Sequence, residues 1–473
     1  MKSSLVLLFW GWTTCVWAAP PEPAVFRAGA ATSNITPEIG LPIIGGFSPY
    51  PSTHVHDELH ARCLVLEDGP TTVALVVCDL LGIHRSLSVE ARRLIQESTG
   101  IPSTHVLISA THTHSASSAL GERGYQSDQE LDAYQKFVAH RIADGVRRAR
   151  NQLRPAQIGF GSVHVPEHVF NRRWFMKEGS PALLSPFGKT DRVKMNPPGG
   201  HPDLIEPAGP IDPEVSFVAV REPTGRMIAV YSAYSLHYVG GTGPADVSAD
   251  YFAIFCETLQ KLQLAHDTGP PFVAMLANGT SGDCNNINFR TPRPSKPPYE
   301  QMRYVAEDVA NQVHKALSHV TWQEKSPLSA QYRELDVAWR TVEPALLDWA
   351  LETETKPENL LKKTDLAVIY AGRIQRLAKA SPTTRLPVQL IRIGEIAIGT
   401  SPCETFAETG LEFKKRSPIK HSFMVELAHG YYGYLPTPRH FEFGGYETWP
   451  GTNYLEPQAS VKIMDALLEM AGQ

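Results

Sequence analysis

Two histidines one residue apart are the residues of this chain best suited to chemistry. His112 and His114 lie in Thr111-His112-Thr113-His114-Ser115, directly after the apolar run 106–110. Residues i and i+2 of a strand face the same side, so both imidazoles are expected to project together where a buried strand ends. Neutral imidazole binds zinc and titrates near neutral pH, so the pair predicts a metal ligand beside a proton-transfer group. The alternative for an H-x-H pair is hydrogen-bonded packing.

Four other candidates share a position just beyond an expected strand, where functional sites are usually built. They are His237 after the run 229–236, Glu404 after the strand ending at Ile398, Tyr434 in the aromatic stretch 431–434, and the loop 282–286 after the strand 272–277. Each has a structural alternative: a capped core histidine, an acid stabilised by a helix dipole, a packed tyrosine, and a set of turn formers.

The elements that must position these residues alternate between strands and helices in the first third of the chain. Two β-rich runs, 62–67 and 72–79, are separated by a turn, and a helix stopped by Gly100 follows. The strand 106–110 and a long helix over about 128–150 come next. This alternation predicts an α/β fold in which mixed β-sheets are layered with helices.

The rest of the chain continues this pattern around one irregular segment. Residues 164–212 are rich in Pro and Gly, which is typical of a functional loop or of disorder. The remaining expected elements are strands at 215–220, 228–236, 272–277 and 422–428, a hairpin at 388–398, and helices at 251–262, 299–318 and 344–379. No linker divides the chain, so a single domain is expected over 19–473. A helical insertion or lid is expected around 341–380, with ordinary helical packing as the alternative.

The ends and the composition of the chain predict an exported protein. The chain has 473 residues and a net charge of −5, and no basic patch suggests nucleic-acid binding. Residues 1–18 resemble a cleaved signal peptide, with Lys2, an apolar stretch and small residues at the cleavage site, so a secreted or periplasmic location is expected. An uncleaved membrane anchor is the alternative. No later segment is expected to span a membrane, and no oligomeric state is predicted.

Five cysteines remain after the expected signal peptide. Cys63 and Cys78 are expected to pair if their strands are neighbours, and Cys284 is expected to be able to pair with Cys403. No CxxC motif is present, so a cysteine-based zinc site is not expected.

Together these segments resemble the catalytic domain of the neutral/alkaline non-lysosomal ceramidases. The resemblance covers nearly the whole chain after the expected signal peptide, and His-Thr-His-Ser is its most specific motif. The matching segments are 29–31, 35–37, 76–82, 112–115, 171–172, His237, 282–283, 402–405 and the tyrosines of 431–446.

The resemblance implies a zinc amidase with a ceramidase-like fold. The zinc ligands it implies are His112, His237, Glu404 and Tyr434. Bound zinc lowers the pKa of water to about 7, so hydroxide becomes available near neutral pH. The resemblance also implies that His114 handles protons near the metal. Arg172 and Tyr446 correspond to groups that polarise the carbonyl and stabilise the developing oxyanion.

The chain departs from the family in two places. The family loop Gly-Asp-x-Ser-Pro-Asn here reads Gly282-Asp283-Cys284-Asn285-Asn286, so Asn285 stands where the serine would be. An amide can donate a hydrogen bond but cannot be an acyl nucleophile, so attack by zinc-bound hydroxide is the simpler mechanism. Cys284 is the alternative nucleophile if its pKa is lowered. The family's C-terminal immunoglobulin-like domain is also not expected in this chain, which ends at Gln473, and this expectation weakens ceramide as the substrate more than it weakens the amidase.

The sequence therefore predicts an exported zinc hydrolase that cleaves an amide bond of an N-acylated, lipid-like or smaller substrate. One alternative keeps the metal but changes the bond to an ester or a carbohydrate-linked amide. Another is a non-catalytic secreted binding protein with a structural metal. A structural zinc site needs neither a proton-transfer group nor additional hydrogen-bond donors beside the metal. The presence of His114, Arg172 and Tyr446 therefore favours an enzyme.

Overall fold

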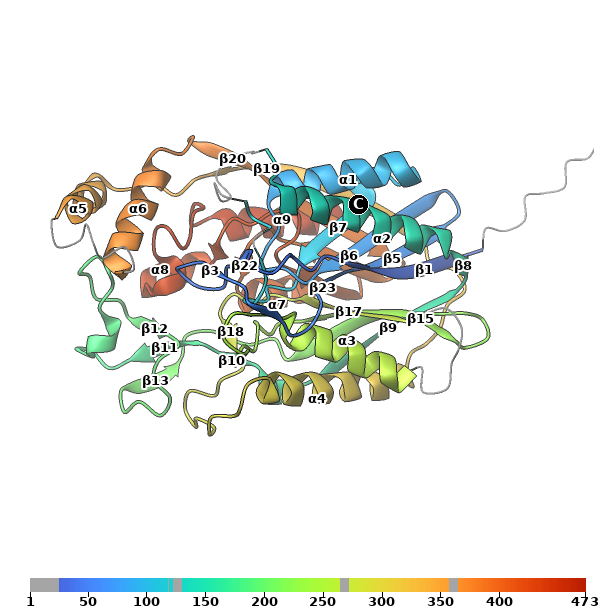
Figure 1. The fold of residues 1–473 in the computed structure, drawn as a ribbon, viewed down its shortest axis with the longest axis horizontal. Coiled ribbons are helices and arrows are strands. Elements are labelled where there is room, and N and C mark those ends of the chain that lie inside the picture. The colour runs from blue at the N-terminus through green and yellow to red at the C-terminus, as the bar shows by residue number, and fades with distance from the viewer. Residues whose placement is uncertain (1–24, 118, 122–129, 264–271, 357–364) are drawn as a thin grey trace, which may run out of the picture.

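The structure is a computed structural model that describes residues 25–117, 119–121, 130–263, 272–356 and 365–473. The expected signal peptide, 1–18, lies outside these residues. The main elements form four layers, with helices, one sheet, two further sheets and again helices stacked in that order (Figure 1). The predicted fold of mixed sheets layered with helices is confirmed.

The first sheet carries the strand that leads to the histidine pair. Its strands are β1 (Arg27–Asn34), β5 (His60–Asp68), β6 (Thr71–Cys78), β7 (Val106–Ala110) and β8 (Arg154–Pro155). They lie in the order β7-β6-β5-β1-β8, and β7 runs parallel to β6. Every residue of β7 is buried, as expected for a strand covered on both faces.

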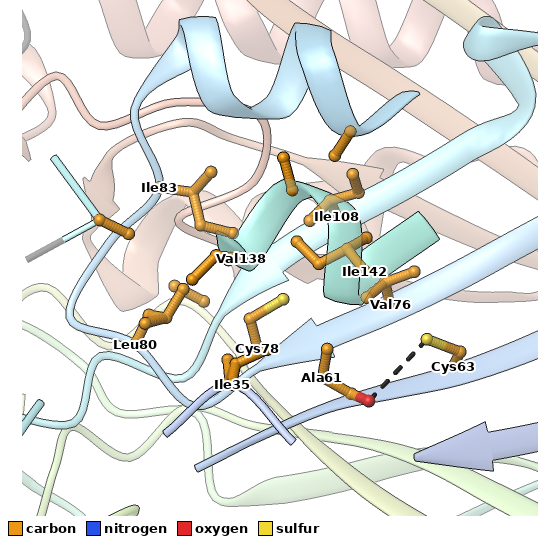
Figure 2. Packing of buried hydrophobic residues seen from close by; sticks show 14 of the residues in the cluster. Ile35, Ala61, Cys63, Val76, Cys78, Leu80, Ile83, Ile108, Val138 and Ile142 are labelled. Atoms are coloured by element: carbon orange, nitrogen blue, oxygen red, sulfur yellow. Dashed lines mark hydrogen bonds between the residues drawn. The ribbon is translucent and has the colours of Figure 1, made fainter. Parts of the chain in front are cut away.

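Two helices cover the outer face of this sheet. They are α1 (Arg85–Thr99) and α2 (Ala133–Asn151). Figure 2 shows Val138 and Ile142 of α2 packed close to Ile108 and Val76 of the sheet. α1 ends as predicted at Gly100, whose φ of 76° is readily adopted only by glycine.

Two four-stranded sheets pack on the inner face of the first sheet. One contains β9 (Gln157–His164), β14 (Glu214–Arg221), β15 (Met227–Tyr234) and β17 (Val273–Asn278), and the other β19 (Leu328–Ala338), β20 (Thr383–Ile393), β21 (Ile396–Thr400) and β23 (His421–Val425). A single apolar cluster joins all three sheets. The outer helices are α3 (Asp250–Gln263), α4 (Glu300–Leu317), α7 (Ala407–Arg416) and α9 (Ala459–Ala471).

Short elements gather at the ends of the main strands. The strands are β2 (Pro42–Ile43), β3 (Tyr50–Pro51), β4 (His54–Val55), β10 (Phe170–Asn171), β11 (Arg173–Met176), β12 (Val193–Met195), β13 (Leu204–Pro207), β16 (Asp246–Val247), β18 (Cys284–Asn285), β22 (Glu404–Thr405) and β24 (Tyr434–Leu435). The helices are α5 (Pro344–Thr355), α6 (Leu366–Ala378) and α8 (Pro438–Phe443). Figure 1 shows α5 and α6 at one end of the molecule, to the side of the large sheets.

Most predicted elements are confirmed, but several observed elements, among them β1, β9 and α9, were not predicted. The segment 164–212, expected to be irregular, contains β10 and the three-stranded sheet β12-β11-β13. The strand β19 was not predicted, because its residues are mostly half-buried and polar residues interrupt its apolar pattern. No helix within the described residues is long and apolar enough to cross a membrane. The single domain and the lid around 341–380 stay predictions.

Both proposed cysteine pairings are wrong. All five cysteines of the described residues are free and buried. Cys63 and Cys78 lie on neighbouring strands, but Cys63 is opposite Val76 and Cys78 is opposite Ala61. Such diagonal neighbours are about 7–8 Å apart, beyond the Cα separation of a disulfide. Cys284 and Cys403 pack in different apolar clusters.

Candidate active site

A left-handed backbone turn, not strand alternation, brings the two motif histidines together. β7 ends at Ala110, and His112 has a φ of 70°. The His112 N–H donates to the Leu80 carbonyl at 2.9 Å, and its Nδ1 lies 2.7 Å from the Leu81 carbonyl oxygen. A carbonyl only accepts, so Nδ1 carries the proton and Nε2 keeps a lone pair. The predicted convergence is right, although the reason given for it is wrong.

His114 points to the same place as His112. The two Nε2 atoms are 3.2 Å apart, and the His114 ring stacks on Tyr238 with a centroid distance of 3.7 Å. A β-carbon on Gly45 would lie 2.1 Å from the His114 carbonyl oxygen, so this close approach requires glycine. Burial and the neighbouring His112 lower the pKa of His114 well below its ordinary value. His114 is therefore a neutral imidazole at neutral pH.

His237 follows β15 and is fixed by two residues that the sequence did not single out. Its Nδ1 lies 3.2 Å from Ser281 Oγ, and Ser281 Oγ donates to Glu426 Oε1 at 2.7 Å. Glu426 Oε2 accepts the Thr405 N–H at 2.6 Å. Burial raises the pKa of Glu426 well above its ordinary value. No motif marks Ser281 or Glu426; the only signal is that each follows a buried strand.

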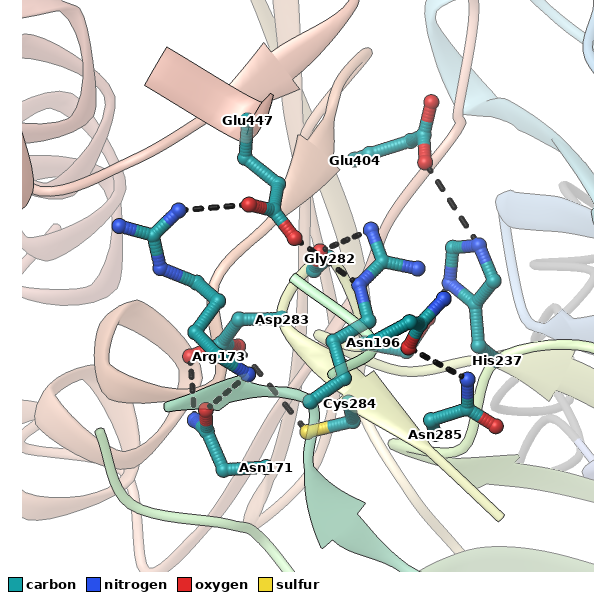
Figure 3. Close-up of polar contacts among 12 residues, drawn as sticks. Asn171, Arg173, Asn196, His237, Gly282, Asp283, Cys284, Asn285, Glu404 and Glu447 are labelled. Atoms are coloured by element: carbon teal, nitrogen blue, oxygen red, sulfur yellow. Dashed lines mark hydrogen bonds and ion pairs between the residues drawn. The ribbon is translucent and has the colours of Figure 1, made fainter. Parts of the chain in front are cut away.

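Glu404 and Tyr434 are placed side by side by strand pairing. β22 and β24 are parallel, and Glu404 pairs directly with Tyr434. Glu404 Oε2 lies 3.2 Å from His112 Nε2 and 3.7 Å from His237 Nε2 (Figure 3 shows the second contact). Its Oε1 accepts the Tyr431 hydroxyl at 2.6 Å, a contact that the sequence did not predict.

The pKa values of Glu404 and Tyr434 shift in opposite directions. Burial raises the pKa of Glu404, but His112 and the hydrogen bonds from Tyr431 and Tyr434 outweigh it and lower the pKa to about 2. Burial raises the pKa of Tyr434 well above its ordinary value, and nearby Arg172 only partly offsets this. The site therefore holds an ionised carboxylate beside a neutral phenol.

Arg172 and Tyr446 border the same space. Arg172 Nε donates to Glu447 Oε1 at 3.0 Å and Nη2 to the Gly282 carbonyl at 2.9 Å, and its guanidinium lies 5.3 Å from the Tyr434 ring centre. The Tyr446 ring packs edge-on against Tyr434 at 5.7 Å. Burial raises the pKa of Tyr446 to about 12, so its hydroxyl keeps its proton.

Asn285 lies to one side of this group. It sits in β18, opposite Phe170 of β10, and its amide donates to Asn196 Oδ1 at 3.0 Å (Figure 3). Asn196 lines the central cavity, whereas Asn285 is not among the lining residues. Neighbouring Cys284 is buried, and burial raises the pKa of its thiol well above the ordinary value. A buried, protonated thiol is a poor nucleophile, so Cys284 is not a candidate.

Asp283 and Asp79 have structural roles. Asp283 accepts the Ala407 N–H at 2.8 Å and the Asn171 amide at 2.8 Å, which ties its loop to α7 and β10. Asp79 forms a buried ion pair with Arg62 at 2.5 Å and contacts none of the candidate ligands in the described structure.

The donor set fits a zinc ion. His237 Nε2 and Glu404 Oε2 are buried, face each other at 3.7 Å and have no hydrogen bond. Buried polar atoms are almost always paired, so these two are suited to a cation between them. Ligand nitrogens of His112, His114 and His237 lie within 4.8 Å of one another. Imidazole and carboxylate donors suit zinc. The His114 imidazole lies next to the other two imidazoles.

A cavity of about 460 Å³ opens above these donors. His112, His114, His237, Glu404, Arg172 and the site tyrosines form one part of its wall. Large apolar side chains form much of the rest, namely Phe47, Leu120, Leu183, Leu184, Val193, Met195, Leu366 and Trp449. The cavity therefore combines a polar floor that carries the candidate metal donors with walls that accept apolar groups.

Comparisons with known proteins agree with this architecture. No protein-family model matches the chain. A curated relative, the neutral ceramidase of Pseudomonas aeruginosa, is 20% identical over 97% of this chain and 74% of that protein. A solved structure of ceramidase complexed with C2 matches 95% of this chain and 75% of that one, with a TM-score of 0.70 and 18% identity. The crystal structure of neutral ceramidase from Pseudomonas aeruginosa has a TM-score of 0.67 at 18% identity, over 95% of this chain and 74% of that one. The chain is therefore a divergent homologue of neutral ceramidase, and it has the fold of those structures.

Proposed function

We propose that this protein is an exported zinc-dependent hydrolase that cleaves the amide bond of an N-acylated, lipid-like substrate. One observation carries the proposal: the unpaired Nε2 of His237 and Oε2 of Glu404 face each other, beside His112, on the floor of the cavity. The similarity to neutral ceramidase supports an amide as the bond that is cleaved. Export rests on the expected signal peptide.

Four residues would hold the ion: His112, His237, Glu404 and Tyr434. Zinc, when bound, would acidify a water molecule and polarise the substrate carbonyl. The hydrogen bond from His112 Nδ1 to a carbonyl fixes the tautomer that leaves Nε2 available. Ser281 does the same for His237.

The remaining side chains move protons and stabilise charge. His114 is neutral and half-buried, so its Nε2 can accept the proton of the attacking water and return it to the leaving amine. Arg172 is held by Glu447 and Gly282, which presets its charge beside Tyr434 for the developing oxyanion. The protonated hydroxyl of Tyr446 can donate a hydrogen bond to the substrate carbonyl. Asn285 is assigned no contact with the reacting atoms, because it reaches the cavity only through Asn196.

The walls of the cavity support an acyl chain as part of the substrate. Phe47, Leu184 and Leu366 line the cavity and are also among the exposed large apolar side chains. Apolar side chains that line a cavity and also reach solvent gain free energy when a substrate chain covers them.

Metal content and turnover test the proposal together. The purified protein, supplied with zinc, is expected to hold one equivalent by mass spectrometry and to hydrolyse N-acyl amides, including N-acylsphingosine, but not matched esters. His112→Ala is expected to lose both the zinc and the activity, whereas His319→Ala, at an exposed position, retains both. A zinc-supplied protein without stoichiometric metal, or unchanged amide hydrolysis in His112→Ala, would contradict the proposal.

A further inference from the structure

One cation in the cavity wall, Arg373, has no carboxylate partner among the residues that the structure describes. Arg373 lies in α6 and lines the cavity. Its guanidinium carbon lies 5.2 Å from the ring centre of Phe47 and 5.3 Å from that of Tyr370. Nη1 donates to the Gly451 carbonyl at 3.1 Å, and within the described residues no carboxylate forms an ion pair with Arg373. Its other N–H groups remain available to a ligand.

The rings that hold Arg373 also connect it to the candidate active site. Phe47 packs edge-on against Tyr446 with a centroid distance of 6.2 Å, and Tyr446 packs against Tyr434 at 5.7 Å. Arg373 and the donors therefore border the same cavity but are separated by aromatic side chains. A ligand group at Arg373 would lie beyond the bond that the active site attacks.

The other charged residues of the cavity wall are balanced. Arg172 is paired with Glu447 at 3.0 Å, and the charge of Glu404 acts on Arg172 as well. Lys194 lies near enough to Asp191 to lower the pKa that burial raises. Arg373 is thus the one charge of the described wall without an opposite charge on the protein. A neutral substrate would leave this charge without a partner.

We propose that Arg373 is an anion-binding residue of the substrate cavity, and that the substrate is an N-acyl amine bearing a carboxylate or phosphate group. A guanidinium binds both groups through two parallel hydrogen bonds, and the two flanking rings fix its plane for this purpose. The inference rests on the proposed amidase function and narrows its substrate class. It differs from a ceramide, which carries hydroxyl groups but no negative charge.

Matched substrates with one acyl chain test the proposal. The pairs are N-lauroyl glycine with N-lauroyl ethanolamine, and N-lauroyl aminohexanoate with N-lauroyl aminohexanol; the phosphate monoesters of the two alcohols complete the panel. The long and short spacers cover different distances between the amide and Arg373. We expect the anionic member of at least one pair to have a kcat/KM about tenfold or more above that of its neutral partner. Whichever of the carboxylate and phosphate substrates has the higher kcat/KM identifies the anion that Arg373 binds.

Substitutions at Arg373 test whether this residue causes the preference for anionic substrates. Arg373→Gln is expected to remove the preference for anionic substrates by raising their KM, and Arg373→Lys is expected to retain part of it. Arg376→Gln removes an exposed cation from the same helix and is expected to leave the preference unchanged. Thermal unfolding checks that each variant is folded. Calorimetric titration with the ketone analogue of N-lauroyl aminohexanoate, in which CH2 replaces the amide NH so that no bond can be hydrolysed, measures binding without turnover. Arg373→Gln is expected to weaken this binding about tenfold.

The outcomes separate this inference from the proposed function. Equal turnover of anionic and neutral partners, or equal losses for both in Arg373→Gln, would overturn the inference and leave the amidase standing. Absence of zinc and of any amide hydrolysis would instead contradict the proposed function, and the titration would then decide on Arg373 alone.

Discussion

The two sides of the cavity are built by different means. At the metal-donor side, backbone contacts fix the ligands: the His112 N–H is bonded to Leu80, and strand pairing places Glu404 beside Tyr434. At the side formed by α6, Arg373 and Leu366 come from one helix of the 341–380 segment, and Arg373 is held by the Phe47 and Tyr370 rings and by the Gly451 carbonyl.

This difference separates chemistry from substrate choice. The donors stand at the ends of buried strands, so a change there disturbs the sheets as well as the site. The α6 wall lies outside the three large sheets, and its side chains can change without altering the donor geometry. We therefore expect substitutions at the donor side to abolish turnover and substitutions at α6 to change which substrate is used.

The largest effect is expected for Glu404→Gln. The amide has nearly the same shape as the carboxylate but cannot supply the negative charge that balances the ion. Zinc affinity and turnover should therefore fall by about a thousandfold or more. This loss exceeds the roughly ten- to hundredfold loss that is typical of residues that only orient a ligand. Metal analysis and amide hydrolysis measure the loss, with Glu307→Gln, at an exposed position of α4, as the control. Full activity in Glu404→Gln would mean that the ion is not held here.

A smaller effect is expected for Ser281→Ala, which removes the hydrogen-bond partner of His237 Nδ1. The imidazole keeps its place but loses its fixed tautomer, so zinc affinity should fall by about ten- to a hundredfold. Competition with a zinc-binding dye measures this affinity, and Ser98→Ala on the exposed face of α1 is the control. Unchanged affinity would show that Ser281 does not orient the ligand.

On the opposite wall, Leu366→Ser is expected to act on binding alone. It removes apolar contact worth about 1 kcal/mol, so KM for long-chain amides should rise about fivefold, while kcat and zinc content stay the same. Short-chain amides should be unaffected. A fall in kcat or in zinc content would show that the two walls are not independent.

The smallest effect concerns the pH dependence of stability. Burial raises the pKa of Asp191, at the cavity wall, above its ordinary value of 3.8, the opposite of the shift at Glu404. Ionised Asp191 therefore costs stability above its folded pKa, and this cost disappears as the pH falls toward 3.8. Solvent reaches part of the side chain, so the cost should stay below about 1 kcal/mol.

Urea unfolding of the metal-free protein and of Asp191→Asn measures this cost. The wild-type chain should gain stability relative to the variant as the pH is lowered, since asparagine keeps an acceptor for the Trp449 N–H without the charge. A stability difference that does not change with pH, or changes in the opposite direction, would contradict the shift.

Much of the fold could be predicted from local patterns. The runs at 62–67 and 72–79 are continuous and largely apolar, which indicates buried strands, and the structure pairs them as antiparallel strands. β19 could not be predicted, because it is half-buried and its pattern is not periodic. The proposed Cys63–Cys78 pair was wrong because the strand register, which the sequence does not reveal, places Cys63 opposite Val76.

The site could be predicted only in part. The donors were recognised by their positions after buried strands together with a family resemblance, and the structure brings His112, His237, Glu404 and Tyr434 together. Ser281, Glu426 and Tyr431 were missed because hydrogen bonds between distant segments leave no local signature. Arg373 was missed for the same reason, since the stacking of a helix residue on Phe47 depends on tertiary packing.

Anomalous X-ray diffraction at the zinc absorption edge, from crystals of the zinc-supplied protein, tests the central claim most directly. The account predicts one strong peak between His112 Nε2, His237 Nε2 and Glu404 Oε2. A zinc peak elsewhere in the molecule, or none at this position with zinc in excess, would contradict it.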